Sequence, residues 1–277
     1  MPTVTVYRHG FSCGVGNPNP HPGERGEVQG WSAAAVRRNL QFLYSVDETK
    51  LPGMGYALTL TVRDCPSSGQ EWTRFRDCWI KRQRREGLQL LHWVTEWQAR
   101  GAPHLHCAAW WSGSDDQHLR AIHDWLELTA ANLLVAIKGQ HVTPIYDPLG
   151  WSQYVSKHAA RGHRHYQRQA VHIPEAWRGQ STGRLWGHLG SWPLRSPAKL
   201  GTDWMVFYQA RRVLRSWRIA DARASGSARR LVSARGCLRC PFPDLSRVRG
   251  LSEWFPEDLA MRVLEGLSQA GGYIESI

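Results

Sequence analysis

Two histidines in the segment HLHCAAWW are spaced for metal binding. His104 and His106 lie two residues apart in a run of β-type residues, and side chains two apart on a strand point to the same face of a sheet. Two neutral imidazoles on one face suit a divalent ion, but a metal site needs further ligands. By themselves, such pairs are more often ordinary core or surface histidines.

Glu96 is the predicted third ligand. If the chain turns around Arg100 and Gly101, in EWQARGAPHLH, residues whose numbers sum to about 200 face one another across a hairpin. Glu96 then lies opposite His104 on the same face. A carboxylate with two imidazoles leaves coordination positions open for substrate oxygens, as a catalytic metal requires.

The segment YVSK supplies a candidate nucleophile. Tyr154 and Lys157 are three residues apart in a predicted helix, so they share one face. A phenol has a pKa of about 10 and is a poor nucleophile at neutral pH, and a nearby ammonium group can assist its deprotonation. The alternative is that Tyr154 packs on the sheet and another tyrosine, such as Tyr166, takes the role.

The elements that must position these residues follow an α+β order. The apolar periodicity predicts an antiparallel sheet with helices packed on one face. The first thirty residues are rich in glycine and proline, and we expect them to be irregular. The predicted elements are helices over 32–45, 69–86, 115–136 and 148–161, and strands over 56–64, 88–98, 104–112 and from 141.

The charge indicates an anionic partner. The formal net charge is +12, with only five lysines among 35 basic residues. Arginine suits phosphate binding, although a GC-rich genome would produce the same bias. No apolar stretch approaches the about 18 to 20 residues of a membrane helix, and no signal peptide is visible. We therefore expect a cytoplasmic protein without a membrane partner. The CxxC of Cys237 and Cys240 lacks a second pair of zinc ligands, and its role is left open.

Three ordered segments resemble the motifs of a known family. ALTLTVRD, EWQARGAPHLHCAAWW and YVSKHAARG are similar to the three motifs of the HUH endonucleases in rolling-circle replication initiators of small plasmids and filamentous phages. The resemblance covers about Ser32 to Pro193. It implies an RRM/ferredoxin-like five-stranded antiparallel sheet with the two histidines on a central strand. We expect an endonuclease domain over 32–197, an irregular segment over 1–31 and a basic, mainly helical extension over 198–277.

The resemblance also implies an activity. His104, His106 and Glu96 would hold Mg²⁺ or Mn²⁺, and Tyr154, helped by Lys157, would nick single-stranded DNA at a hairpin-forming origin. The products would be a 5′-phosphotyrosine and a 3′-OH primer for the host helicase and polymerase. Phage initiators often carry two tyrosines one turn apart, whereas position 158 here is histidine. Tyr166, another subunit or water would then complete the cycle.

Six arginines are candidate DNA contacts, and each has the alternative of being merely solvated. Other functions also stay open: a single-tyrosine transposase, a relaxase using Tyr7, a zinc hydrolase using water, and a nucleic-acid-binding protein without catalysis. The candidate contacts are Arg74, Arg82, Arg85, Arg161, Arg164 and Arg168.

Overall fold

The computed structural model describes residues 1–16, 26–113, 116–130, 137–152, 166–239 and 250–277. Within these ranges, no helix combines the length and apolarity needed to cross a membrane. The chain divides into two compact units. Unit 1 comprises Met1–Gly23, Gln41–Asp47 and Leu194–Ile277, and unit 2 comprises Glu24–Leu40 and Glu48–Pro193. The endonuclease-domain boundaries expected at residues 32 and 197 stay a prediction.

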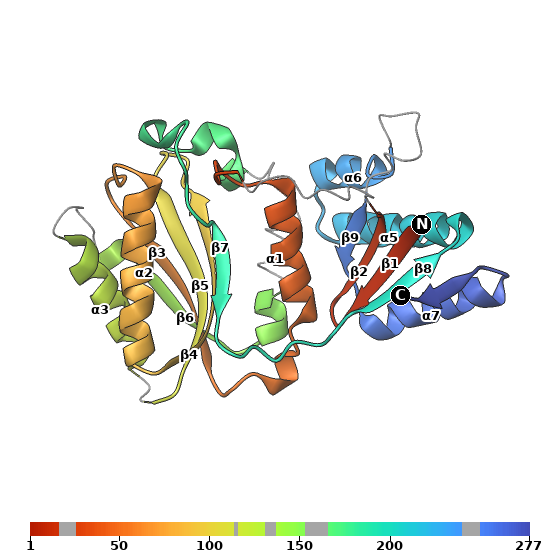
Figure 1. The fold of residues 1–277 in the computed structure, drawn as a ribbon, viewed down its shortest axis with the longest axis horizontal. Helices are drawn as coiled ribbons and strands as arrows, with labels where there is room; N and C mark the ends of the chain where they lie inside the picture. The colour runs from red at the N-terminus through yellow and green to blue at the C-terminus, as the bar shows by residue number, and fades with distance from the viewer. Residues whose placement is uncertain (17–25, 114–115, 131–136, 153–165, 240–249) are drawn as a thin grey trace. The chain divides into compact units, whose positions relative to one another are not determined.

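Unit 2 is built on a five-stranded antiparallel sheet with strand order β6-β3-β5-β4-β7. The elements from β3 to β6 alternate as βαββαβ, the order of ferredoxin-like folds. The α+β class and the five-stranded sheet are thus confirmed, and the strand β5 that carries both histidines is central (Figure 1). The elements are β3 (Gly55–Thr61), α2 (Gly69–Arg85), β4 (Leu88–Trp97), β5 (Pro103–Trp111), α3 (Gln117–Ala130), β6 (His141–Ile145) and β7 (Trp186–Leu189).

The β4–β5 hairpin has the register that the sequence predicts. Glu96 pairs with His104, and Val94 pairs with His106. The turn closes through the Gln98 amide, which donates to the Ala102 carbonyl at 2.8 Å. Gly101 has φ +79°, a left-handed conformation that costs a residue with a Cβ about 1–2 kcal/mol. A glycine at this position therefore helps to set which residues face one another.

Helices α2 and α3 cover one face of this sheet (Figure 1). Their contact with it contains Trp72, Trp79 and Trp125, all fully buried. Each indole N–H is satisfied: Trp72 donates to Thr95 Oγ1, Trp79 to the Ala121 carbonyl and Trp125 to the Thr61 carbonyl. These large side chains therefore bury much apolar area and leave none of their three indole N–H groups without a hydrogen bond.

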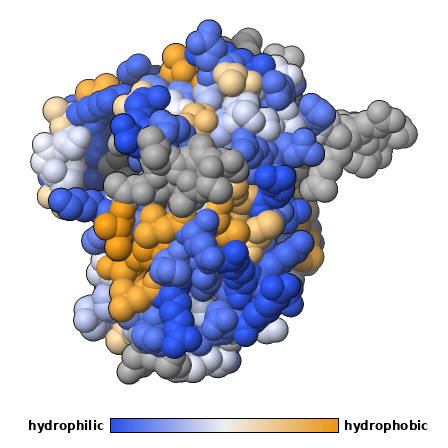
Figure 2. All heavy atoms as spheres, turned by 90° about the vertical axis from the view of Figure 1, so that its left-hand side faces the viewer, coloured by the Kyte–Doolittle hydropathy of each residue, from blue (hydrophilic) through white to orange (hydrophobic). Residues whose placement is uncertain are grey.

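The face of the molecule that Figure 2 shows is mostly hydrophilic, with a hydrophobic band across part of it. Helix α2 is capped at its N-terminus by Ser68, whose hydroxyl accepts a hydrogen bond from the Glu71 backbone amide at 3.1 Å. An N-cap of this kind typically stabilises a helix by about 1 kcal/mol.

The other face of the sheet is partly covered by the first part of α1 (Ala33–Ser45). Asn39 of this helix hydrogen-bonds His92 Nε2 of β4 at 2.8 Å, and both side chains are buried. Further along the same face, Trp110 and Trp151 join a small apolar cluster. Short 3-10 helices complete the unit: η1 (Glu48–Lys50), η2 (Ile137–Gly139), η4 (Tyr166–Arg168), η5 (Ala170–His172) and η6 (Glu175–Trp177).

Unit 1 corrects one expectation, an irregular N-terminus, and the described part of its C-terminal region is mainly helical as predicted, with three short strands besides. The N-terminal segment contains two strands, which join C-terminal strands in a second five-stranded sheet of order β10-β8-β1-β2-β9. Its elements are β1 (Pro2–Tyr7), β2 (Gly10–Val15), β8 (Ala198–Thr202), α5 (Trp204–Ala224), α6 (Ala228–Arg235), β9 (Leu251–Trp254), α7 (Glu257–Gln269) and β10 (Ile274–Ser276).

The physical reason is an apolar alternation that flanks the Gly/Pro-rich stretch. Val4, Val6, Phe11 and Cys13 are at most 2% exposed and pack in one core cluster with residues of α5. Alternate apolar residues on a strand bury one face of a sheet, so these short runs fold as strands once α5 covers them. Cys237 is a free thiol of this unit, and Cys240 lies outside the described residues.

Candidate metal centre

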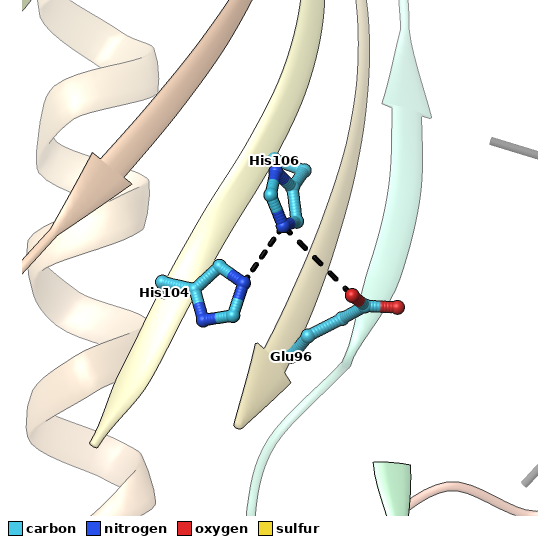
Figure 3. Close-up of side chains that lie close together, drawn as sticks. All are labelled: Glu96, His104 and His106. Atoms are coloured by element: carbon cyan, nitrogen blue, oxygen red, sulfur yellow. Dashed lines mark hydrogen bonds and ion pairs between the residues drawn. The ribbon is translucent and has the colours of Figure 1, made fainter. Parts of the chain in front are cut away.

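The predicted ligands meet on the sheet face opposite α2 and α3. His104 and His106 project from β5, and Glu96 projects from β4 toward them (Figure 3). The hairpin register places Glu96 directly across from His104, and cross-strand partners share a face. Residues from two adjacent strands thus form one cluster.

The distances within this cluster suit a single ion. The Nε2 atoms of His104 and His106 lie 2.7 Å apart, and Glu96 Oε2 lies 3.8 Å from His106 Nε2. One ligand atom from each residue falls within 4.8 Å of the other two. Two imidazole nitrogens and one carboxylate oxygen can bind Mn²⁺, Mg²⁺ or Zn²⁺, which differ in their preference for nitrogen over oxygen ligands.

Thr59, on the neighbouring strand β3, orients one of the two histidines. Its Oγ1 lies 3.0 Å from His106 Nδ1, because β3 and β5 pair Thr59 with His106. Hydrogen bonding at one ring nitrogen sets the tautomer and leaves the other nitrogen for a metal. His104 Nδ1 is buried without a hydrogen-bond partner among the described residues, so only its Nε2 is engaged.

The electrostatics favour neutral imidazole and ionised carboxylate. Burial, followed by the neighbouring His106, lowers the pKa of the His104 imidazole to about 3. Burial by itself raises the pKa of the Glu96 carboxyl, but Arg168 and the two histidines more than offset it, so this pKa lies below its usual value. Both groups are therefore in their metal-binding forms at neutral pH.

The cluster is buried on one side and open on the other. Glu96 and His104 are each 3% exposed, whereas the side chain of His106 is 37% exposed. Solvent can therefore reach the cluster at His106. An open coordination sphere of this kind is typical of a catalytic rather than a structural metal site.

Arg168 is part of this cluster, which corrects its assignment as a DNA contact. It is 2% exposed, and its Nε donates to Glu96 Oε1 at 2.6 Å. A side chain buried in this way cannot reach a phosphate at the surface. No sequence signal pointed to this pairing, since Arg168 lies 72 residues from Glu96 in a cationic stretch.

The arginines of α2 are not brought to the cluster, because α2 covers the opposite face of the sheet. Arg74 and Arg85 are exposed there. Arg82 forms ion pairs with Glu127, at 2.5 Å, and with Asp124 of α3. These two acids, with His123, form a second candidate metal group, but their pairing with Arg82 already accounts for their charge.

The predicted nucleophile and its helper lie outside the described residues, as do Arg161 and Arg164. Just before Tyr154, residues 148–152 are helical. The Trp151 ring there meets His92 edge-on, with the ring centroids 6.1 Å apart. His92 lies on the same strand and face as Glu96, four residues away. The segment that leads into Tyr154 thus begins on the ligand face.

Comparison with known proteins gives consistent matches. Residues 55–161 match the family model of the replication-associated protein ORF2/G2P. A putative replication protein of Xylella fastidiosa strain Temecula1 is 51% identical over 262 residues, which cover 92% of this chain and 99% of that protein. Replication-associated protein G2P of Pseudomonas phage Pf3 is 46% identical over 277 residues, covering 98% and 99%. No solved structure matches significantly.

Proposed function

This chain belongs to the replication-associated protein ORF2/G2P family, and on that premise we propose that it initiates rolling-circle replication by nicking single-stranded DNA at an origin. The observation that carries the proposal is the Glu96–His104–His106 cluster on an open sheet face. An initiator with this chemistry is a site-specific endonuclease and strand transferase that acts in the cytoplasm of a bacterial host.

The cluster would hold the metal through the two Nε2 atoms and one Glu96 oxygen. A divalent ion held there, Mg²⁺ or Mn²⁺, would act as a Lewis acid toward the scissile phosphate and would offset charge on the leaving oxygen. Glu96 and His104 are each only 3% exposed, so little water reaches that side of the cluster. Such exclusion strengthens the electrostatic effect of each charged group.

Tyr154 is the proposed nucleophile. Its phenolic oxygen loses its proton and forms a bond to phosphorus while the bond from phosphorus to the 3′ oxygen breaks. The leaving oxygen takes up a proton and becomes the 3′-OH primer, and the 5′ end stays linked to Tyr154. Lys157 would stabilise the phenolate by its positive charge. Attack by a 3′-OH on the phosphotyrosine reverses the step and reseals the strand without ATP.

Tyr7, the nucleophile that a relaxase would require, is poorly placed for this role. It is 6% exposed in β1 of unit 1 and packs against Tyr44, with ring centroids 5.8 Å apart. Burial also raises the pKa of its phenol, which makes deprotonation harder. The described geometry therefore favours a nucleophile that follows the histidines in the chain.

The test is covalent capture of origin DNA. The full chain is incubated with Mn²⁺ and 3′-labelled single-stranded DNA that spans the replicon's origin, and adducts are separated under denaturing conditions. We expect an adduct with the wild type and with Tyr166→Phe, and none with Tyr154→Phe. An adduct of equal yield from Tyr154→Phe, or none from the wild type, would contradict the proposal.

A further inference from the structure

The buried arginine that follows the proposed nucleophile has a specific geometric relation to the metal cluster. Arg168 Nε and Nη2 both approach Glu96 Oε1, at 2.6 Å and 2.5 Å. Arginine–carboxylate pairs often use two parallel hydrogen bonds, one to each oxygen. Here both donors converge on one oxygen, which leaves Oε2 directed toward His106.

A second contact holds the guanidinium in place. Its Cζ lies 4.3 Å from the centre of the Trp31 ring, and arginine stacks favourably on an indole face. The Trp31 Nε1 in turn donates to the Thr95 carbonyl at 3.0 Å, one residue before Glu96. The ring is therefore anchored to the strand that carries the ligand, and Arg168 lies between ring and carboxylate.

The pair is also shielded from water. The side chains of Arg168 and Glu96 are 1% and 4% exposed, so neither group can turn to solvent without rearrangement. Removing one partner of a buried pair leaves the other charge uncompensated. Outer residues that orient a ligand typically matter about 10- to 100-fold for metal affinity.

We propose that Arg168 is a positioning residue for the metal centre: held by Trp31, it binds Glu96 Oε1 and so presents Oε2 as a single-oxygen ligand. The inference rests on the proposed function, because it assumes that Glu96, His104 and His106 bind a divalent ion. A carboxylate that supplies one oxygen leaves more of the coordination sphere to DNA oxygens than one that supplies two. Arg168 thus acts through Glu96 and not on substrate.

The experiment measures Mn²⁺ binding by the loss of the free-ion EPR signal, with the full chain and no DNA. The variants are Arg168→Gln, Glu96→Gln and the double variant. We expect Arg168→Gln to raise the Kd about 10- to 100-fold. In the Glu96→Gln background the same change should alter the Kd less than about twofold, because the residue that it positions is already altered.

Arg76→Gln is the matched control. Arg76 is also buried and stacked on an indole, with Cζ 4.1 Å from the Trp93 ring, but it lies on the α2 side of the sheet. It forms an ion pair with Asp77. Its loss should lower the melting temperature and leave the Mn²⁺ Kd unchanged. A purely structural role for Arg168 would give the same pattern.

The outcomes separate the two levels of the proposal. If the wild type binds no Mn²⁺, or Glu96→Gln binds it equally well, the metal centre itself fails and the role of Arg168 with it. Two outcomes overturn only the positioning role. In the first, Glu96→Gln weakens Mn²⁺ binding but Arg168→Gln does not. In the second, Arg168→Gln raises the Kd by the same factor in the wild-type and Glu96→Gln backgrounds. Should Arg168→Gln not fold, Trp31→Leu removes the ring beneath the guanidinium, and an unchanged Kd overturns the role.

Discussion

The Nε2 atoms of His104 and His106 lie 2.7 Å apart, so both imidazoles present the same nitrogen to the space between them. Two unprotonated nitrogens at this distance repel each other unless a proton or a cation lies between them. Burial keeps the pKa of His104 near 3, which disfavours a second proton on that ring. A neutral imidazole still carries one proton, so one Nε2–H can make this contact as a hydrogen bond. With that proton on Nδ1 instead, both Nε2 atoms are free to bind a cation between them.

Loss of either histidine should abolish tight Mn²⁺ binding. His104→Ala or His106→Ala removes one of the three proposed ligands, and we expect the Kd to rise more than about 100-fold, beyond the usual cost of losing an outer partner. Isothermal titration with Mn²⁺ measures the change. His141→Ala is the matched control, since His141 is an exposed histidine of the same sheet. A comparable loss in that variant would count against the assignment.

Thr59 should matter through its hydroxyl. Thr59→Val keeps the shape of the side chain but loses the contact to His106 Nδ1, which lies at 3.0 Å. We expect the Mn²⁺ Kd to rise about tenfold in this variant and to stay near the wild-type value in Thr59→Ser, which retains the hydroxyl. If the valine and serine variants bind Mn²⁺ equally, Thr59 does not orient His106.

Mild acid should destabilise the metal-free protein at pH values above those at which carboxylates usually titrate. Burial lowers the pKa values of His92 and His104 to about 3, whereas an unfolded histidine has a pKa of about 6.5. Between these values only the unfolded chain takes up the proton. The contribution of each neutral histidine to the free energy of unfolding is therefore complete above about pH 6.5. It decreases as the pH falls, and at pH 5 the loss is about 2 kcal/mol per histidine.

Urea unfolding at pH 7 and pH 5, with EDTA present, measures this loss. His92→Gln removes one of the two buried groups, and it should reduce the pH-dependent part of the stability by about half. His141→Gln, which changes an exposed histidine, should leave it as in the wild type. An undiminished pH dependence in His92→Gln would show that other groups are responsible.

Local sequence was sufficient to predict that Glu96, His104 and His106 come together and to predict much of the fold of unit 2. The turn at Arg100 and Gly101 determines which residues of β4 and β5 face one another, and the two-residue period of a strand puts His104 and His106 on one face. The helices could be read because their apolar spacing and caps are local, as at Ser68 and Glu71. These features depend on residues that are close together in the sequence.

What only the tertiary structure decided depends on contacts between distant segments. The pairing of Arg168 with Glu96 requires the chain after the proposed nucleophile to return to β4, and Thr59 reaches His106 because of the order of strands in the sheet. In unit 1, β1 and β2 are stabilised by burying their apolar sides against α5, almost 200 residues later in the chain. No local pattern encodes such partners, because their stabilisation comes from burial and charge compensation after the chain has folded.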